Sequence, residues 1–167
     1  MASGDDGRQF EDYPGSPDSV IIVGATLLDD GRWEETLDIN GSKIKQGSSF
    51  GKRLTVMAPT ENLLVCGPHL EHVYTREDGP LGPTDADFNR LGAYFVFPNG
   101  ATSCAAPIVT SLVALVYSVR PDLDAPAVVD IVKQGCDDIG DKGYDVYTGC
   151  GRVNFGKTIR IAVKWNE

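Results

Sequence analysis

Two short apolar runs stand out in the first third of the chain. Residues 19–28 read Ser-Val-Ile-Ile-Val-Gly-Ala-Thr-Leu-Leu, and residues 53–59 read Arg-Leu-Thr-Val-Met-Ala-Pro. Neither run alternates apolar with polar positions, which is typical of strands covered on both faces, as in a parallel sheet. The turn residues 29–31 end the first strand and Pro59 ends the second. Residues 63–66 predict a third, edge-like strand.

Beyond residue 100 the pattern becomes helical. A long apolar helix is predicted to begin close to Ser103 and to run to about Val119, just before Arg120-Pro121. A second helix is predicted over 125–134, because Asp124 can cap its amino end, a proline falls in its first turn and Gly135 follows it. The tail closes on one more apolar segment.

Polar segments separate these elements. Residues 1–19 and 32–49 are rich in turn-forming residues and predict loops. Residues 66–99 are interpreted as a surface insertion loop, with one short strand over 93–97. The whole chain, 1–167, is therefore interpreted as part of a single domain with this insertion.

Composition narrows the class of protein. A hydrophobic fraction of 41% with 23% charged residues is ordinary for a globular protein. No apolar run approaches the roughly 20 residues needed to cross a bilayer, so a soluble chain with no membrane partner is expected. The net charge of −9 argues against nucleic acid as a partner, because binding it requires a basic face.

Cysteine and histidine usage gives no metal signal. The four cysteines form no CxxC pair, and the two histidines, His69 and His72, lie near only Cys66. No metal site and no cofactor are therefore predicted. Cys104 is interpreted as a small core residue, whereas Cys136 and Cys150 flank a turn region and could pair if the protein is secreted.

The strongest chemical signal is the stretch 99–107, Asn-Gly-Ala-Thr-Ser-Cys-Ala-Ala-Pro. It places Ser103 in the first turn of the long helix, where unpaired N–H groups and the positive helix end converge. Alanines on both sides leave room for a peptide backbone. Two interpretations stay open, a serine nucleophile and an ordinary helix N-cap.

Residues 101–111, Ala-Thr-Ser-Cys-Ala-Ala-Pro-Ile-Val-Thr-Ser, resemble the nucleophile motif of the subtilisin-like serine proteases, commonly Gly-Thr-Ser-Met-Ala-Ala-Pro-His-Val-Ala-Gly. The chain departs from it at Ala101, Cys104, Ile108 and Ser111. Three further stretches resemble the family's motifs in the family's order, and they lie at 3–25, 49–59 and 144–155. The first reads Ser-Gly-Asp-Asp-Gly where the family has Ala-Gly-Asn-x-Gly, the second includes Val-Met-Ala-Pro, and the third includes Gly-Cys-Gly-Arg-Val-Asn.

This resemblance implies an α/β fold, the C-terminal part of a subtilisin-like parallel-sheet sandwich with helices on both faces. It also implies a serine endopeptidase that cleaves a polypeptide substrate with Ser103 as nucleophile. Asp5 takes the oxyanion-hole position, and the substrate-binding residues are Ala2, Ser3, Gly4 and Thr102. The family orders its triad Asp, His, Ser, so the aspartate and histidine are expected upstream, in a missing N-terminal half. An extracellular location is favoured on the same ground.

Other interpretations compete with this one. The chain could be a non-catalytic subtilase relic or polypeptide-binding module, or a truncated gene model. Neither His69 nor His72 fits the role of the missing base. Asp5 could be only a solvated residue of an acidic turn beside Asp6. Because the elements expected to cover the two apolar strands would belong to the absent half, the chain alone is expected to expose a large apolar edge.

Overall fold

The computed structural model describes residues 1–10, 20–39, 41–66, 75–76, 79–80, 94–99 and 101–165. The chain divides into two compact units. The main unit comprises residues 1–60 and 101–167, and the second unit comprises residues 61–100. The main unit carries the three helices of the described chain and every residue of the predicted site.

A small parallel sheet forms the centre of the main unit. Strand β1 (Val23–Thr26) pairs in parallel with β4 (Val56–Pro59), so that Val23 lies opposite Val56. Ala2 extends the sheet beyond β1 and Arg152 extends it beyond β4, each through a parallel bridge. The two predicted central strands are confirmed, with β1 shorter than predicted at both ends and β4 shorter at its amino end. The predicted α/β fold is confirmed as well.

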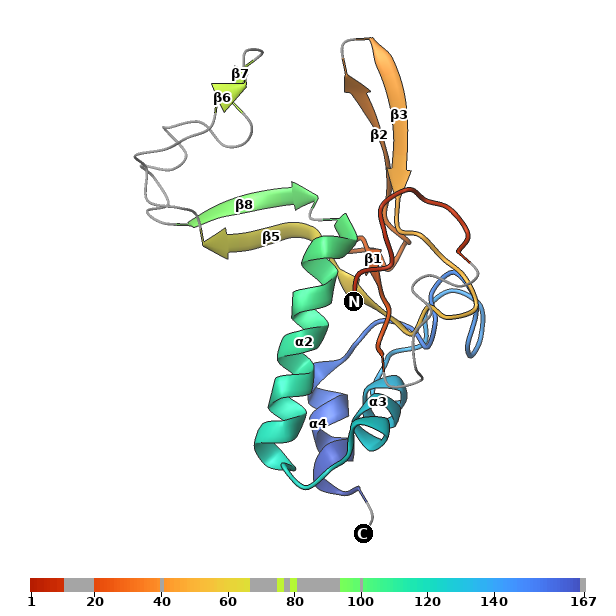
Figure 1. Ribbon diagram of the computed structural model, residues 1–167, viewed down its shortest axis with the longest axis vertical. Helices are drawn as coiled ribbons and strands as arrows, with labels where there is room; N and C mark the ends of the chain where they lie inside the picture. Colours follow the sequence, from red (N-terminus) through yellow and green to blue (C-terminus); the bar gives the residue numbers. More distant parts are fainter. Residues whose placement is uncertain are drawn as a thin grey trace. The chain divides into compact units, whose positions relative to one another are not determined.

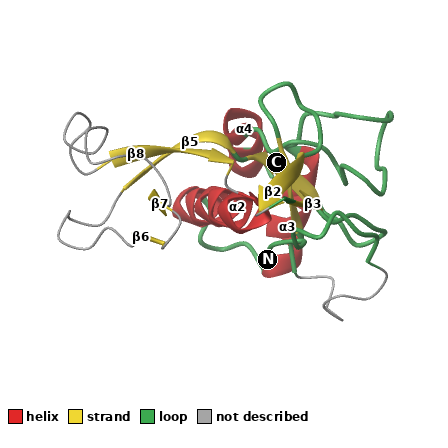
Figure 2. Cartoon of the chain, turned by 90° about the horizontal axis from the view of Figure 1, so that it is seen from above, coloured by secondary structure: helices red, strands yellow, loops and turns green. Residues whose placement is uncertain are grey.

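Three helices pack together beside this sheet (Figures 1 and 2): α2 (Ala101–Val119), α3 (Ala125–Gln134) and α4 (Phe155–Val163). One stripe of α2 is buried at helical spacing and contacts β1 and β4. The stripe consists of Thr102, Ala105, Val109, Leu112 and Val116. On the alternate positions of the strands, Ile22 and Met57 join a second, smaller apolar cluster with Leu54 and Ile139.

The chain's own elements cover its central strands, which corrects the expectation of a large exposed apolar edge there. All four β1 residues are buried, and the β4 residues Val56, Met57 and Ala58 are 0% exposed. The physical reason is that α2 and the second cluster supply both sides of these strands from within the chain. The exposed large apolar residues of α2 are instead Leu115 and Val119.

The local capping chemistry sets the helix ends. The structure gives α3 the predicted bounds: the Ala127 N–H donates to Asp124 Oδ1 at 2.9 Å, and Gly135 ends the helix. The sequence did not predict α4. Its N-cap is Asn154, whose Oδ1 accepts from the Lys157 N–H at 3.0 Å.

The structure places an antiparallel hairpin where residues 32–49 were predicted to be loop. It consists of β2 (Glu34–Ile39) and β3 (Ser42–Gly47), with Asp38 opposite Lys43. Most of β3 is exposed, so no buried face marks the segment in the sequence. A backbone hydrogen bond connects the start of the hairpin to β1: the Trp33 N–H donates to the Ala25 carbonyl at 2.9 Å.

The described residues of the second unit form two antiparallel pairs of strands. Strand β5 (Glu61–Cys66) pairs with β8 (Tyr94–Asn99), and β6 (Thr75–Arg76) pairs with β7 (Gly79–Pro80). The strands predicted at 63–66 and 93–97 are therefore present as β5 and β8. Most of the predicted surface insertion lies outside the described residues, and its assignment as an insertion remains an expectation.

Three thiols in the described part of the chain are free. They belong to Cys104, Cys136 and Cys150, so the pairing of Cys136 with Cys150 is not observed. Burial raises the pKa of the Cys136 thiol to about 12, and the thiol donates to the Val132 carbonyl at 3.3 Å. Cys136 is therefore an inert core residue.

Helix α2 corrects the expectation that no apolar run approaches membrane-spanning length. Its 19 residues have a mean hydropathy of 1.7, enough by length and composition to cross a bilayer. Such a helix is also typical of a protein core, and the buried stripe of α2 contacts the parallel sheet. Packing within the main unit accounts for the buried stripe of α2, whereas Leu115 and Val119 on the same helix are exposed.

Candidate active site

The amino end of α2 is tied to the segment that begins the chain. A helix leaves its first N–H groups without intrahelical acceptors. Here Asp5 Oδ1 accepts from the Thr102 N–H at 2.9 Å and from the Thr102 hydroxyl at 2.6 Å. The Thr102 Oγ1 in turn accepts from the Gly4 N–H at 3.2 Å. Thr102 is fully buried, so these bonds fix the first turn of the helix from the inside.

Backbone bonds on both sides hold Asp5 in place. The Ser3 N–H donates to the Val23 carbonyl at 2.9 Å, which puts residues 1–3 beside β1. The Asp5 carbonyl accepts from the Gly47 N–H at 2.9 Å, and the Gly4 carbonyl accepts from the Ser49 N–H at 2.8 Å. The loop that carries Asp5 therefore leaves the carboxyl end of a parallel segment, where open α/β sheets generally bind ligands.

Ser103 is the next residue along the helix and is exposed, in contrast to buried Thr102. It stands inside the first turn of α2, so the interpretation of Ser103 as the helix N-cap is wrong. The capping acceptor is the side chain of Asp5, which comes from 97 residues earlier in the chain. An exposed hydroxyl at a helix amino end sits in a positive local field, which favours an anionic group beside it.

The other predicted site residues lie along the same short path. Gly4 adopts a φ of +101°, and a Cβ there would lie 3.4 Å from Ser49 Oγ, so a side chain would be strained in this loop. Ser3 is only 5% exposed, and its hydroxyl lies 3.4 Å from Ser48 Oγ. Ser3 can therefore line a site through its backbone, whereas Ala2 is half-buried.

The thiol of Cys104, next to Ser103 in the sequence, ionises less readily than a free cysteine. Burial, with a smaller contribution from the Asp5 carboxylate, raises the pKa of Cys104. A thiolate is the reactive form of cysteine. Cys104 is therefore held as the neutral, less reactive thiol.

The sequence's two histidines, His69 and His72, lie outside the described residues. In the part that is described, no three His, Cys, Asp or Glu side chains gather as a metal-binding group. The site seen here thus consists of a serine, its helix end and the Asp5–Thr102 contact.

Comparison with known proteins assigns the chain to a family. The model of the subtilase family, Peptidase_S8, matches residues 1–151. The chain belongs to the subtilase family. The match includes the candidate site, because Asp5, Thr102 and Ser103 all lie within residues 1–151.

Among curated relatives, the chain is 28% identical to serine protease AprX of Bacillus subtilis over 92% of its own length. It is 26% identical over 96% of its length to the cell wall-associated protease of the same organism. It covers only 33% and 17% of these relatives' own lengths. A crystal structure of a lanthipeptide protease shares the fold, with a TM-score of 0.64 at 19% identity, covering 96% of this chain and 49% of that one.

Ala101 carries backbone strain at the point where the family motif has glycine. Its φ is +52°, in the left-handed region that costs an L-residue with a Cβ roughly 1–2 kcal/mol. We expect Ala101→Gly to raise the free energy of unfolding by about 1 kcal/mol, because glycine removes this strain at a smaller entropic cost. Urea unfolding followed by circular dichroism measures the change.

The matched control for this prediction is Ala114→Gly, the same substitution at an exposed site inside α2. It should lower the free energy of unfolding by about 0.5–1 kcal/mol. If Ala101→Gly destabilises the protein as much as Ala114→Gly does, the left-handed conformation at Ala101 is not present in solution.

Proposed function

We propose that this protein is a serine endopeptidase of the subtilase family in which Ser103 is the nucleophile. The observation that carries the proposal is the exposed Ser103 in the first turn of α2. It directly follows Thr102, whose N–H and hydroxyl both donate to Asp5 Oδ1. Its hydroxyl would attack the peptide carbonyl, and the N–H groups of the helix start would face the developing oxyanion. Subtilase membership supports this assignment.

The general base and its orienting aspartate would come from the part of the enzyme that precedes this chain. The proposal is supported by length, because the chain spans 33% of AprX and 49% of the lanthipeptide protease. It is supported as well by the resemblance, which orders the triad Asp, His, Ser. The 66–99 stretch would then be a surface insertion into the catalytic domain.

The substrate would be a polypeptide. Ala2, Ser3 and Gly4 run along the outer side of β1 and lead directly to Thr102 through the Gly4 N–H. Their small side chains and the inward-turned Ser3 hydroxyl leave a backbone-lined wall beside Ser103, suited to part of the pocket for the residue before the scissile bond. The name of the cell wall-associated relative supports an extracellular site of action.

Asp5 would act mainly as a positioning residue. By resemblance it stands where an asparagine usually donates to the oxyanion, but an ionised carboxylate offers only acceptors. In this structure it uses one oxygen to hold Thr102. Oxyanion stabilisation would then fall on the backbone N–H groups at the start of α2.

This same feature favours a second candidate function. A carboxylate beside a developing oxyanion repels it, so the fold could have been kept as a polypeptide-binding module that no longer cleaves. The labelling experiment that follows separates the two candidates.

The purified chain should not react with a fluorophosphonate probe, because an unassisted serine hydroxyl is a weak nucleophile and loss of the base alone costs several orders of magnitude. The protein extended upstream through the expected Asp and His should be labelled at Ser103, as read by mass spectrometry.

Two variants of the extended protein control that experiment. Ser103→Ala should abolish labelling, and Ser111→Ala, at an exposed serine further along α2, should not. Stoichiometric labelling of the isolated chain would show that the base lies within it. Absence of labelling in the extended, folded protein would favour the binding module.

Asp5→Asn in the extended enzyme should raise turnover near neutral pH by up to about 10²-fold, because an amide can accept from Thr102 and also donate to the oxyanion. Asp6→Asn changes the same charge one residue away and should leave turnover near the wild-type value. Equal turnover of Asp5→Asn and wild type would mean that Asp5 does not face the oxyanion.

A further inference from the structure

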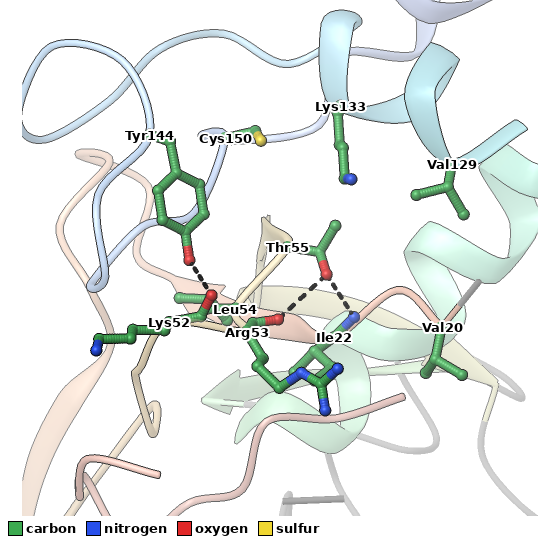
Figure 3. Close-up of a pocket in the computed structure, with 10 residues that line it drawn as sticks. All are labelled: Val20, Ile22, Lys52, Arg53, Leu54, Thr55, Val129, Lys133, Tyr144 and Cys150. Atoms are coloured by element: carbon green, nitrogen blue, oxygen red, sulfur yellow. Dashed lines mark hydrogen bonds between the residues drawn. The ribbon is translucent and has the colours of Figure 1, made fainter. Parts of the chain in front are cut away.

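A pocket lies at the opposite end of the parallel strands from Ser103. Its volume is about 280 Å³, just below the usual range for ligand sites. Two of its residues, Ile22 and Thr55, immediately precede β1 and β4, whereas the Asp5 loop follows the carboxyl end of its segment. The ten lining residues, drawn in Figure 3, are Val20, Ile22, Lys52, Arg53, Leu54, Thr55, Val129, Lys133, Tyr144 and Cys150.

The pocket is cationic in a strongly acidic chain. Among the described residues that line it, three are Lys52, Arg53 and Lys133 and none is Asp or Glu, although the chain carries a net charge of −9. Figure 3 shows the Lys133 ammonium group directed toward Thr55, into the space between Tyr144 and Val129. The carboxylate recorded beside Lys133 is Asp130, 3.8 Å from Nζ and 60% exposed, so this ion pair is weak.

The floor of the pocket is apolar. Ile22 and Leu54 are 1% exposed and Val129 is 5% exposed. The hydroxyl groups in the pocket are already engaged by the protein. Thr55 Oγ1 accepts from the Ile22 N–H at 3.0 Å, and the Tyr144 hydroxyl donates to the Lys52 carbonyl at 2.7 Å. The cationic side chains are therefore the polar groups best able to meet a ligand.

The thiol of Cys150, which lines the pocket, carries no negative charge that would repel an anion. Burial raises the pKa of Cys150, an effect that the nearby Lys133 ammonium partly offsets. Cys150 is therefore neutral at physiological pH. Its sulfur adds a polarizable surface to the pocket lining between Tyr144 and Lys133, as Figure 3 shows.

We propose that this pocket binds a small organic carboxylate with an apolar body. The carboxylate would lie against the Lys133 ammonium, with Lys52 and Arg53 at the rim, and the apolar body would cover Ile22, Leu54 and Val129. Charge-assisted hydrogen bonds and the removal of the ligand's own apolar surface from water together supply the affinity. Two sources share this chemistry, the C-terminal residue of a peptide and a short fatty acid. The site is independent of the proposed peptidase activity.

The test is titration calorimetry of the purified chain with matched probes. N-acetyl-glycyl-leucine and its C-terminal amide differ only in the anionic group, and N-acetyl-glycyl-glycine lacks the apolar side chain. Octanoate represents the fatty acid, and inorganic phosphate represents an anion without an apolar body. The leucine carboxylate or octanoate should bind at least tenfold more tightly than the amide, the glycine peptide and phosphate, and the stronger of the two identifies the source.

Lys133→Met should weaken that binding by about tenfold or more, since a hydrogen bond to a charged group is lost. Lys43→Met, which removes the same charge from the hairpin strand β3, should leave it unchanged. Circular dichroism establishes that both variants fold. The Lys52→Met variant, at an exposed position on the rim of the pocket, repeats the measurement of carboxylate binding at a second lining cation. Equal binding of acid and amide, equal binding of phosphate, equal losses in Lys133→Met and Lys43→Met, or no binding of any probe would each overturn the proposal.

Discussion

The carboxylate of Asp5 closes the amino end of α2, and the arrangement of the main unit depends on that contact. Two donors of Thr102 converge on one carboxylate oxygen, and Thr102 is fully buried. Capping interactions of this kind stabilise a helix by about 0.5–2 kcal/mol. The contact joins the first parallel segment to a helix 97 residues further on, so it sets where the helix begins and where Ser103 is presented.

The same contact links stability to chemistry at this end of the sheet. A carboxylate is a good partner for a helix amino end, but a poor neighbour for an oxyanion. Ala101 adds strain at the same turn. The opposite end of the strands has the reverse character, because Lys52, Arg53 and Lys133 are among the residues that line a pocket with an apolar floor there. The parallel strands thus separate an anionic contact at Asp5 from a cationic pocket.

Much of the main unit could be predicted from local signals. Asp124, Pro126 and Gly135 mark the bounds of α3, and unbroken apolar runs mark β1 and β4. The hairpin β2–β3 was missed because most of β3 is exposed, although the sequence Asn-Gly at 40–41 is a typical signal for a hairpin turn. Helix α4 was missed because its short apolar pattern is compatible with a strand, and only the Asn154 cap marks its beginning.

The candidate site was predictable only in part. The motif at 101–111 singled out Ser103, and family resemblance brought Asp5 into the same site. Neither could establish which group donates and which accepts, because the Asp5–Thr102 contact joins residues that are distant in sequence and depends on the packing of β1 against α2.

Amide hydrogen exchange at Thr102 tests the central claim most directly. First-turn amides normally exchange fast because they lack intrahelical acceptors. The Thr102 amide should be protected relative to the Ser103 amide, and Asp5→Ala should remove that protection while the Val109 amide deeper in α2 stays protected. A Thr102 amide that exchanges as fast as Ser103 in the unmodified protein would show that Asp5 does not hold the start of α2.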